Sequence, residues 1–395
     1  MYERKDLSSL LKRLKEPRKF IQVLSGPRQI GKTTIAEQLI KKISMPYSFF
    51  SADGIPSADS LWINQIWESA RLKMDSANDK GYLLIIDEIQ KISNWSEYIK
   101  RNWDMDSRKG INLKLLILGS SNMLLNKGLT ESLTGRFELI KLSHWSFTEM
   151  KNAFDFNAEE YAYFGGYPGA ACLIKNEKRW KDYIINSIVE TTISKDILQT
   201  VHIQKPALLK NLFELSCKYA GEILSYTKIL GQLNDAGNTT TLAHYQELLD
   251  KSWMIKGLQK FSKSKVSTRS SIPKWLAYNT SFASVYSQIG FKETKKNPAL
   301  WGRRVEQAIG AYLLNQTHIC GFNLFYWRDG NNEVDFILKK DNKIVALEVK
   351  ASNLKFHKGL NEFNKKYKVD KNILISNESF SWMDMLNIDI SKLFS

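Results

Sequence analysis

A glycine-rich segment near the N-terminus has the residue types and spacing of a site that binds nucleotide phosphates. It consists of Gly26, Pro27, Arg28, Gln29, Ile30, Gly31, Lys32, Thr33 and Thr34, and satisfies the pattern GxxxxGK[ST]. Glycines let backbone N–H groups curl around phosphate oxygens, and the N-terminus of a following helix adds its positive end. We expect Lys32 to reach the β- and γ-phosphates of ATP and the Thr33 hydroxyl to ligate Mg²⁺.

Two acidic residues follow a second apolar run, residues 82–86. A carboxylate at the C-terminal end of a parallel strand lies next to the phosphate loop, so Asp87 is predicted to hold the magnesium ion and its water shell. Glu88 is then placed to polarise the attacking water. The sequence thus predicts hydrolysis as well as binding.

Smaller polar residues and one arginine complete this set. Ser120 and Ser121 follow the apolar run 113–118, where they could sense the γ-phosphate. Arg136 directly precedes a strand-like segment, where an arginine could contact a nucleotide in a neighbouring subunit and stabilise the transferring phosphoryl group. A surface arginine fits the spacing equally well.

The elements that must position these residues are visible as patterns. Residues 20–24 form a short β-branched and apolar run before the glycine-rich segment, and an amphipathic helical pattern follows it up to residue 43. Strand, loop and helix in this order favour an α/β fold with a parallel sheet.

A second set of chemically suited residues lies in the last third of the chain. Glu306 belongs to a predicted helix over 301–314, and Asp335 and Glu348 belong to predicted strands over 333–338 and 344–350. Alternation places Glu348 and Lys350 on one strand face. Three carboxylates and a lysine predict a second Mg²⁺ or Mn²⁺ site, with Lys350 orienting a water for phosphodiester cleavage. Alternatively, the same fold keeps its carboxylates, cuts nothing and acts as a binding platform.

The middle of the chain is predicted to be mostly helical. A helical lid is expected over 151–204, followed by three helices and two strands within 205–290. This order resembles a winged helix-turn-helix, and residues 251–275 contain seven Lys or Arg and no acid: Lys251, Lys256, Lys260, Lys263, Lys265, Arg269 and Lys274. A basic wing suits a DNA backbone, but modules of this shape also bind proteins.

Composition narrows the function classes. The chain has 395 residues, and 57 basic against 41 acidic side chains give a formal charge of +16. Such a charge attracts DNA by counterion release, although excess lysine can also simply keep a protein soluble. Three scattered cysteines indicate neither disulfides nor a zinc site. Without an apolar run of about 18 residues or a secretory signal, we expect a cytoplasmic protein with no membrane contact.

The motifs GPRQIGKTT, LLIIDEIQ, LILGSSN and SLTGRFE resemble those of prokaryotic AAA-type (AAA+) ATPases, in particular a family whose C-terminal half is a domain of unknown function. The resemblance implies a phosphate loop at residues 26–34, metal and water carboxylates at Asp87 and Glu88, a polar sensor at Ser120 with Ser121, and an arginine finger at Arg136. The later succession of helix-borne Glu, VD and ExK resembles the PD-(D/E)XK nuclease superfamily, notably Holliday junction resolvase-like members, although Val334 replaces the proline.

Together these features predict an AAA+ core over 1–150, a helical lid over 151–204, a winged helix over 205–290 and a nuclease-like domain over 291–395. The predicted function is Mg²⁺-dependent ATP hydrolysis coupled to DNA binding and DNA cleavage. The alternatives are an ATP-controlled switch that binds a protein partner through a silent nuclease-like domain, and a small-molecule kinase. A homo-oligomer is implied if Arg136 acts in trans.

Overall fold

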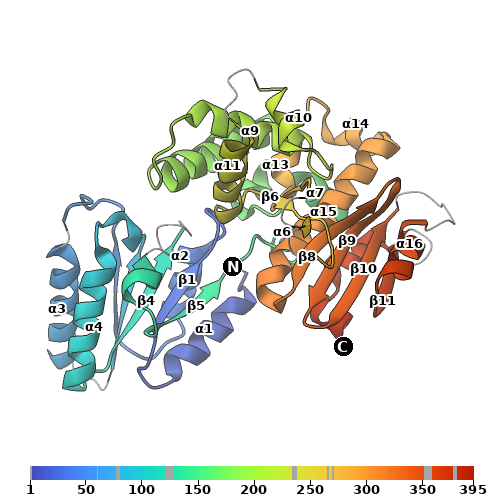
Figure 1. The fold of residues 1–395 in the computed structure, drawn as a ribbon. Helices are drawn as coiled ribbons and strands as arrows, with labels where there is room; N and C mark the ends of the chain where they lie inside the picture. Colours follow the sequence, from blue (N-terminus) through green and yellow to red (C-terminus); the bar gives the residue numbers. More distant parts are fainter. Residues whose placement is uncertain are drawn as a thin grey trace. The chain divides into compact units, whose positions relative to one another are not determined.

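The computed structural model describes residues 2–59, 61–76, 81–120, 128–233, 238–264, 267–268, 271–350, 358–376 and 380–395. The chain divides into two compact units, Met1–Ser143 and His144–Ser395. Figure 1 shows both units and labels most of their helices and many of their strands. The predicted core extends to residue 150, but its last strand ends at Lys141 and the division follows Ser143. The predicted ranges 151–204, 205–290 and 291–395 stay predictions.

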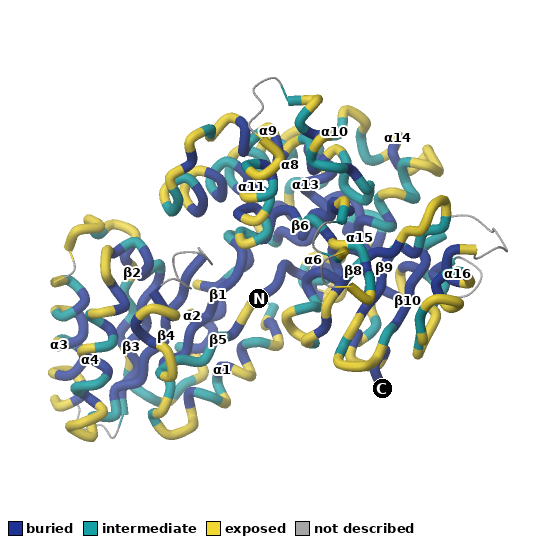
Figure 2. Tube along the Cα trace, in the orientation of Figure 1, coloured by how far each residue is buried: buried dark blue, intermediate teal, exposed yellow. Residues whose placement is uncertain are grey.

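Unit 1 is built on a parallel sheet in the order β2-β3-β4-β1-β5. Its strands are β1 (Ile21–Ser25), β2 (Tyr47–Ser51), β3 (Tyr82–Asp87), β4 (Leu113–Gly119) and β5 (Phe137–Lys141). The three central strands, β1, β3 and β4, are buried along their whole length, as Figure 2 shows in dark blue. Burial on both faces explains why these strands read as continuous apolar runs.

Helices cover both faces of this sheet (Figure 1). They are α1 (Lys5–Lys15), α2 (Lys32–Ile40), α3 (Leu61–Ser76) and α4 (Trp95–Lys109), with a short 3₁₀ turn, η1, at Ile89–Lys91. Trp67 of α3 and Trp103 of α4 pack against alternate residues of the central strands, including Val23 and Leu84. Helix α1 buries Leu7, Leu10 and Leu14 on one face and carries basic residues in its last turn, so it is amphipathic. The architecture is that of a P-loop nucleotide-binding fold.

The first part of unit 2 is mainly helical. Its elements are α6 (Phe147–Phe154), α7 (Ala158–Phe164), η2 (Pro168–Leu173), α8 (Glu177–Tyr183), η3 (Ile184–Val189), η4 (Thr192–Leu198), α9 (Pro206–Lys218), α10 (Tyr226–Leu230), α11 (Thr239–Lys251), β6 (Ile255–Leu258), β7 (Lys274–Ala277), α13 (Thr280–Val285) and α14 (Phe291–Lys296). Strands β6 and β7 pair antiparallel. Three helices therefore precede a two-stranded sheet, the order expected from the sequence.

The last part of unit 2 surrounds a four-stranded sheet in the order β11-β10-β9-β8. It contains α15 (Pro298–Cys320), β8 (Asn323–Asp329), β9 (Asn332–Lys340), β10 (Lys343–Val349), α16 (Lys358–Lys366), β11 (Lys371–Ile375), α17 (Trp382–Asn387) and η5 (Ile390–Phe394). Strands β8, β9 and β10 run antiparallel, and β11 joins β10 in parallel.

Helix α15 is longer than the predicted 301–314. The Asn297 side chain accepts hydrogen bonds from the backbone N–H groups of Ala299 and Leu300, and Pro298 occupies the first turn. At the other end Gly321 adopts a left-handed φ of 67°. These caps set the helix ends on either side of Glu306.

No helix among the described residues is both long enough and apolar enough to cross a lipid bilayer.

Candidate functional site

The predicted phosphate loop connects the end of β1 to the start of α2. Gly31 has a left-handed φ of 88° and Gln29 has a φ of 58°, which turns the loop back onto the helix N-terminus. A Cβ at Gly26 would lie 2.6 Å from the Leu142 carbonyl oxygen, so only glycine fits this position. The loop therefore has the close backbone approach that phosphate binding needs.

Lys32 is buried at the first position of α2, with 7% of its surface exposed. Its ammonium group donates hydrogen bonds to the carbonyl oxygens of Gly26, at 3.1 Å, and Pro27, at 2.7 Å. Both acceptors are neutral and belong to the loop itself. Phosphate oxygens carry charge and are stronger acceptors, so they can replace these carbonyls as partners of Lys32.

Thr33 and Asp87, the two predicted magnesium ligands, lie side by side. The Thr33 hydroxyl donates a hydrogen bond of 2.9 Å to Asp87 Oδ2 at the C-terminal end of β3. Burial raises the pKa of Asp87, which the Thr33 hydrogen bond opposes. A hard cation would reduce the cost of burying the Asp87 carboxylate, because it compensates the negative charge. One hydroxyl and one carboxylate oxygen fit Mg²⁺, which takes few protein ligands and fills its octahedron with water and phosphate.

Glu88 directly follows Asp87 at the end of β3, and its side chain contacts Ser120 at the end of β4. It has a left-handed φ of 54°, and its Oε2 accepts hydrogen bonds from Ser120 Oγ, at 3.0 Å, and Gln90 Nε2, at 2.7 Å. The structure thus brings the predicted water-polarising carboxylate and the predicted sensor together. Gln90 was not singled out from the sequence, although its spacing of two residues from Glu88 is a usable signal. Ser121 lies outside the described residues.

Arg136 does not join this group within its own subunit. Its carbonyl accepts from Ile21 N–H, which places it at the beginning of β1, whereas the phosphate loop follows Ser25 at the end of that strand. Four residues at about 3.3 Å each separate the two levels by about 13 Å. Its guanidinium instead forms a two-pronged pair with Asp104 of α4, at 2.7 and 3.0 Å, which lowers the Asp104 pKa.

In unit 2, the predicted carboxylates gather around a lysine that was assigned to another region. Lys274 of β7, only 1% exposed, places its Nζ 2.7 Å from Glu306 Oε1, 3.1 Å from Glu333 Oε1 and 3.2 Å from Asp335 Oδ1. We refer to these four residues as the Lys274 cluster. The sequence placed Lys274 in a basic wing facing a phosphate backbone, and that prediction is wrong because the side chain is buried among carboxylates.

Glu348 of β10 and Lys350, which directly follows that strand, lie beside this cluster. Their side chains pair at 2.8 Å, and Asp335 Oδ2 accepts a hydrogen bond of 2.8 Å from the Val349 N–H. Burial raises the pKa of Glu348, with a further contribution from Asp335. Burial likewise raises the pKa of Glu306 to about 7, although Lys274 opposes the shift.

The nuclease-like resemblance implies a divalent metal at Glu306, Asp335 and Glu348, and this arrangement does not fit one. Divalent cations need carboxylate oxygens at about 2.0–2.6 Å, and the Lys274 ammonium already lies against Glu306 and Asp335. Across the part of the chain that the structure describes, no group of three or more His, Cys, Asp or Glu residues has the geometry to hold a metal ion. The predicted second metal site is corrected accordingly.

The parallel sheet, the phosphate loop and the Thr33–Asp87 contact define a P-loop nucleotide-binding domain. Residues 18–151 match a family described as an AAA domain, so unit 1 contains an AAA-type P-loop ATPase domain, and this supports ATP binding. Residues 155–293 and 301–388 match two further families, each described as a domain of unknown function.

Curated relatives cover most of the chain. An uncharacterized protein of Haemophilus influenzae is 24% identical over 356 residues, which is 84% of this chain and 82% of the relative. Uncharacterized proteins of Methanocaldococcus jannaschii and Mycobacterium tuberculosis are 25% and 24% identical, over 82% and 89% of this chain and 73% and 75% of their own lengths.

Solved structures with some likeness include a variant of RuvB from Thermotoga maritima, with a TM-score of 0.35 and 17% identity, covering 64% of this chain and 87% of that one. The Orc1 protein of Aeropyrum pernix, solved in complex with DNA, has a TM-score of 0.32 and 12% identity, covering 73% and 92%. At these TM-scores the likeness carries no argument about function.

Proposed function

We propose that unit 1 hydrolyses ATP with Mg²⁺. The observation that carries this proposal is the convergence of Thr33, Asp87, Glu88 and Ser120 at the carboxyl ends of β3 and β4 beside the phosphate loop. Mg²⁺ supplies charge neutralisation on the phosphate oxygens, and Thr33 and Asp87 are the residues that would hold it.

The remaining residues act on the nucleotide and on water. Lys32 exchanges its loop carbonyls for phosphate oxygens, and the loop N–H groups add further donors. Glu88 orients and polarises the attacking water, while Gln90 and Ser120 fix the direction of its carboxylate. Because Ser120 bonds directly to Glu88, a γ-phosphate near Ser120 would change the position of that carboxylate.

Arg136 is proposed to act on the nucleotide of a second copy of this chain. Its distance from its own phosphate loop excludes a role within one subunit, and the Asp104 pair holds its guanidinium at the surface. The competing interpretation is that Arg136 only ties β5 to α4. A role in a neighbouring subunit predicts that ATP turnover per chain increases with protein concentration. This increase should be absent in Arg136→Ala.

Two variants test the ATPase proposal. Lys32→Ala should lose ATP binding measured by calorimetry, whereas Glu88→Gln should bind ATP and release phosphate far more slowly than the unmodified protein. If Glu88→Gln hydrolyses ATP at an unchanged rate, the assignment of Glu88 is wrong. If Lys32→Ala binds ATP unchanged, the whole site is wrong.

We propose further that unit 2 engages a partner under control of the nucleotide, and that DNA is the first candidate because the chain carries a formal charge of +16. One observation favours the alternative of a protein partner. Within the predicted basic wing, Lys251 and Lys256 pair with Glu247 and Asp250, which reduces the charge available to phosphates.

Retention of duplex DNA at increasing salt separates these two partners. A phosphate-binding surface should lose affinity steeply with ionic strength, and absence of retention at low salt would favour the protein partner. We do not propose that unit 2 cleaves DNA, because cleavage needs a metal that the Lys274 cluster does not accommodate.

A further inference from the structure

We infer that the Lys274 ammonium takes the place of a divalent cation in the nuclease-like fold, so that the chain carries its own cation where a metal would lie. This inference concerns unit 2 and does not depend on ATP hydrolysis by unit 1. It makes the domain a silent member of its fold class and gives Lys274 a role that its place in a basic segment does not suggest.

The environment of the amine carries this inference. Its three carboxylate partners come from two elements, Glu306 from α15 and both Glu333 and Asp335 from β9, and all lie within 3.2 Å. The Phe336 ring centroid lies 5.4 Å away on a further side. The ammonium lies between carboxylate oxygens that a divalent cation would need, and the aromatic face is a further partner that suits an ammonium.

The backbone of Lys274 fixes the amine in this position. Lys274 pairs with Leu258 in the β6–β7 sheet and forms an isolated bridge with Ile223 on its other side. Because its strand is held on both edges, the backbone of Lys274 stays beside the carboxylates, and its side chain is 1% exposed. Access of a metal would require breaking this packing.

The charges explain why the lysine stays ionised. Burial would lower the pKa of Lys274, but Glu306, Asp335 and Glu333 together raise it above its usual value. Counting Glu348 and Lys350, four carboxylates face two ammonium groups. The carboxyl groups thus outnumber the ammonium groups, and once the Lys274 amine is removed their oxygens should accept a divalent cation, which favours their ionised form.

Counting bound Mn²⁺ by electron paramagnetic resonance tests the inference. The full chain is used without nucleotide and with Asp87→Asn, which removes the metal ligand of unit 1. This background should bind no Mn²⁺ at the cluster. Adding Lys274→Ala should create one saturable Mn²⁺ site, because a like charge no longer competes for the same oxygens. Adding Glu306→Gln as well should remove that site.

Lys350→Ala is the matched control, because it removes an ammonium from the same neighbourhood and leaves Lys274 in place. It should gain no site. Saturable Mn²⁺ binding by the Asp87→Asn background that Glu306→Gln abolishes would overturn the inference, and so would Lys274→Ala gaining nothing. If Lys274→Ala does not fold, Lys274→Met keeps the volume of the stem and gives the same test.

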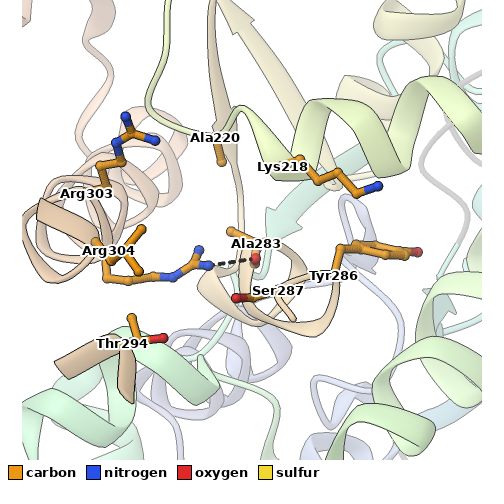
Figure 3. Close-up of a pocket in the computed structure, with 9 residues that line it drawn as sticks. Lys218, Ala220, Ala283, Tyr286, Ser287, Thr294, Arg303 and Arg304 are labelled. Carbon is orange, nitrogen blue, oxygen red and sulfur yellow. Dashed lines mark hydrogen bonds between the residues drawn. The ribbon is translucent and has the colours of Figure 1, made fainter. Parts of the chain in front are cut away.

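A different observation supports a second inference, that a pocket of about 170 Å³ in unit 2 binds a phosphoryl oxyanion (Figure 3). Its cationic lining comes from Lys218 of α9 and from Arg303 and Arg304 of α15. Arg303 pairs with Glu222 at 2.8 Å. Arg304 is different, because among the described residues no carboxylate lies within 4.0 Å of its guanidinium.

Arg304 is the residue on which this second inference depends. Its Nη2 donates a hydrogen bond of 2.9 Å to the Ala283 carbonyl, drawn as a dashed line in Figure 3. Burial lowers the pKa of Arg304, so the cost of desolvating the guanidinium outweighs the interactions that favour its charged form. A guanidinium that is desolvated next to a pocket and a lysine favours an anion with several oxygens.

Calorimetric titration with orthophosphate and with AMP tests the pocket in a Lys32→Ala background, which disables the phosphate loop of unit 1. We expect saturable binding that Arg304→Gln and Lys218→Met each weaken by at least about tenfold, the usual effect of losing one charged hydrogen bond. Tighter binding of AMP than of orthophosphate would identify a nucleotide as the source of the phosphoryl group. Absence of binding, or binding unaffected by both variants, would overturn the inference.

Discussion

Two buried lysines of this chain, Lys32 and Lys274, are almost equally hidden from solvent and have opposite surroundings. Lys32 donates to two neutral carbonyls of its own loop, whereas Lys274 lies among three carboxylates. Neutral partners can be exchanged for a charged ligand, but carboxylates hold the ammonium in place. In this account Lys32, which lies in the phosphate loop, serves a ligand site, whereas Lys274 takes the place of a ligand.

The largest effect that this comparison predicts is on ATP turnover. Lys32→Ala should lower phosphate release at least about 100-fold, as expected for loss of a donor to the transferring phosphoryl group. Its free energy of unfolding should change less than that of Lys274→Ala, since the hydrogen bonds lost to Gly26 and Pro27 go to neutral carbonyls. A variant that unfolds readily in urea would contradict the comparison, because Lys32 would then be structural.

Lys274→Ala should show the reverse pattern. Removing one partner of a buried ion cluster costs about 3–5 kcal/mol, because the remaining carboxylates are left uncompensated. Urea unfolding of the full chain, followed by fluorescence, measures this loss. In the Asp87→Asn background, which lacks the metal ligand of unit 1, millimolar Mn²⁺ should restore part of the stability lost in Lys274→Ala and add none where Lys274 is present. A change below about 1 kcal/mol would show that the cluster does not hold Lys274 as described.

The pH dependence of stability gives a smaller effect with a definite sign. Since the folded-state pKa of Glu306 is raised to about 7 from an ordinary value of 4.5, the folded chain binds the extra proton. The contribution of Glu306 to stability is therefore present at low pH and is lost as pH rises from about 4.5 to about 7. Glu306→Gln should remove this slope from the pH profile of the unfolding free energy. If Glu306→Gln leaves the slope unchanged, the slope belongs to another titratable group.

The smallest effect concerns Arg136 and Asp104, whose side chains are 33% and 27% exposed. A double-mutant cycle on stability should give a coupling of at most about 1 kcal/mol, as is usual for pairs near the surface. Arg136→Ala should nevertheless reduce turnover, if the arginine acts on a neighbouring subunit. A large coupling with unchanged turnover would make the pair purely structural.

The two sites also differ in how far they could be predicted. The phosphate loop, its flanking strand and its helix are contiguous in sequence, and local geometry alone places Lys32 and Thr33. Asp87 lies 54 residues from Thr33, but parallel strands carry their C-terminal ends to one edge of a sheet, so their meeting could also be expected.

The Lys274 cluster could be predicted only in part. The period-2 alternation of β10 placed Glu348 and Lys350 on one face, and Glu306 and Asp335 do converge. Lys274 is 59 residues from Glu333 and lies on a strand of a different sheet, so no periodic pattern connects them. A run of seven basic residues without an acid favoured a surface assignment, and only the tertiary packing shows that one member points inward.

The count of Mn²⁺ bound per chain at a saturating concentration of a non-hydrolysable ATP analogue is the most direct test of this contrast. We expect one ion per chain in the unmodified protein, held at Thr33 and Asp87. In Lys274→Ala we expect two. Two ions in the unmodified protein would show that the cluster accepts a metal beside its lysine. No ion would contradict the magnesium site of unit 1.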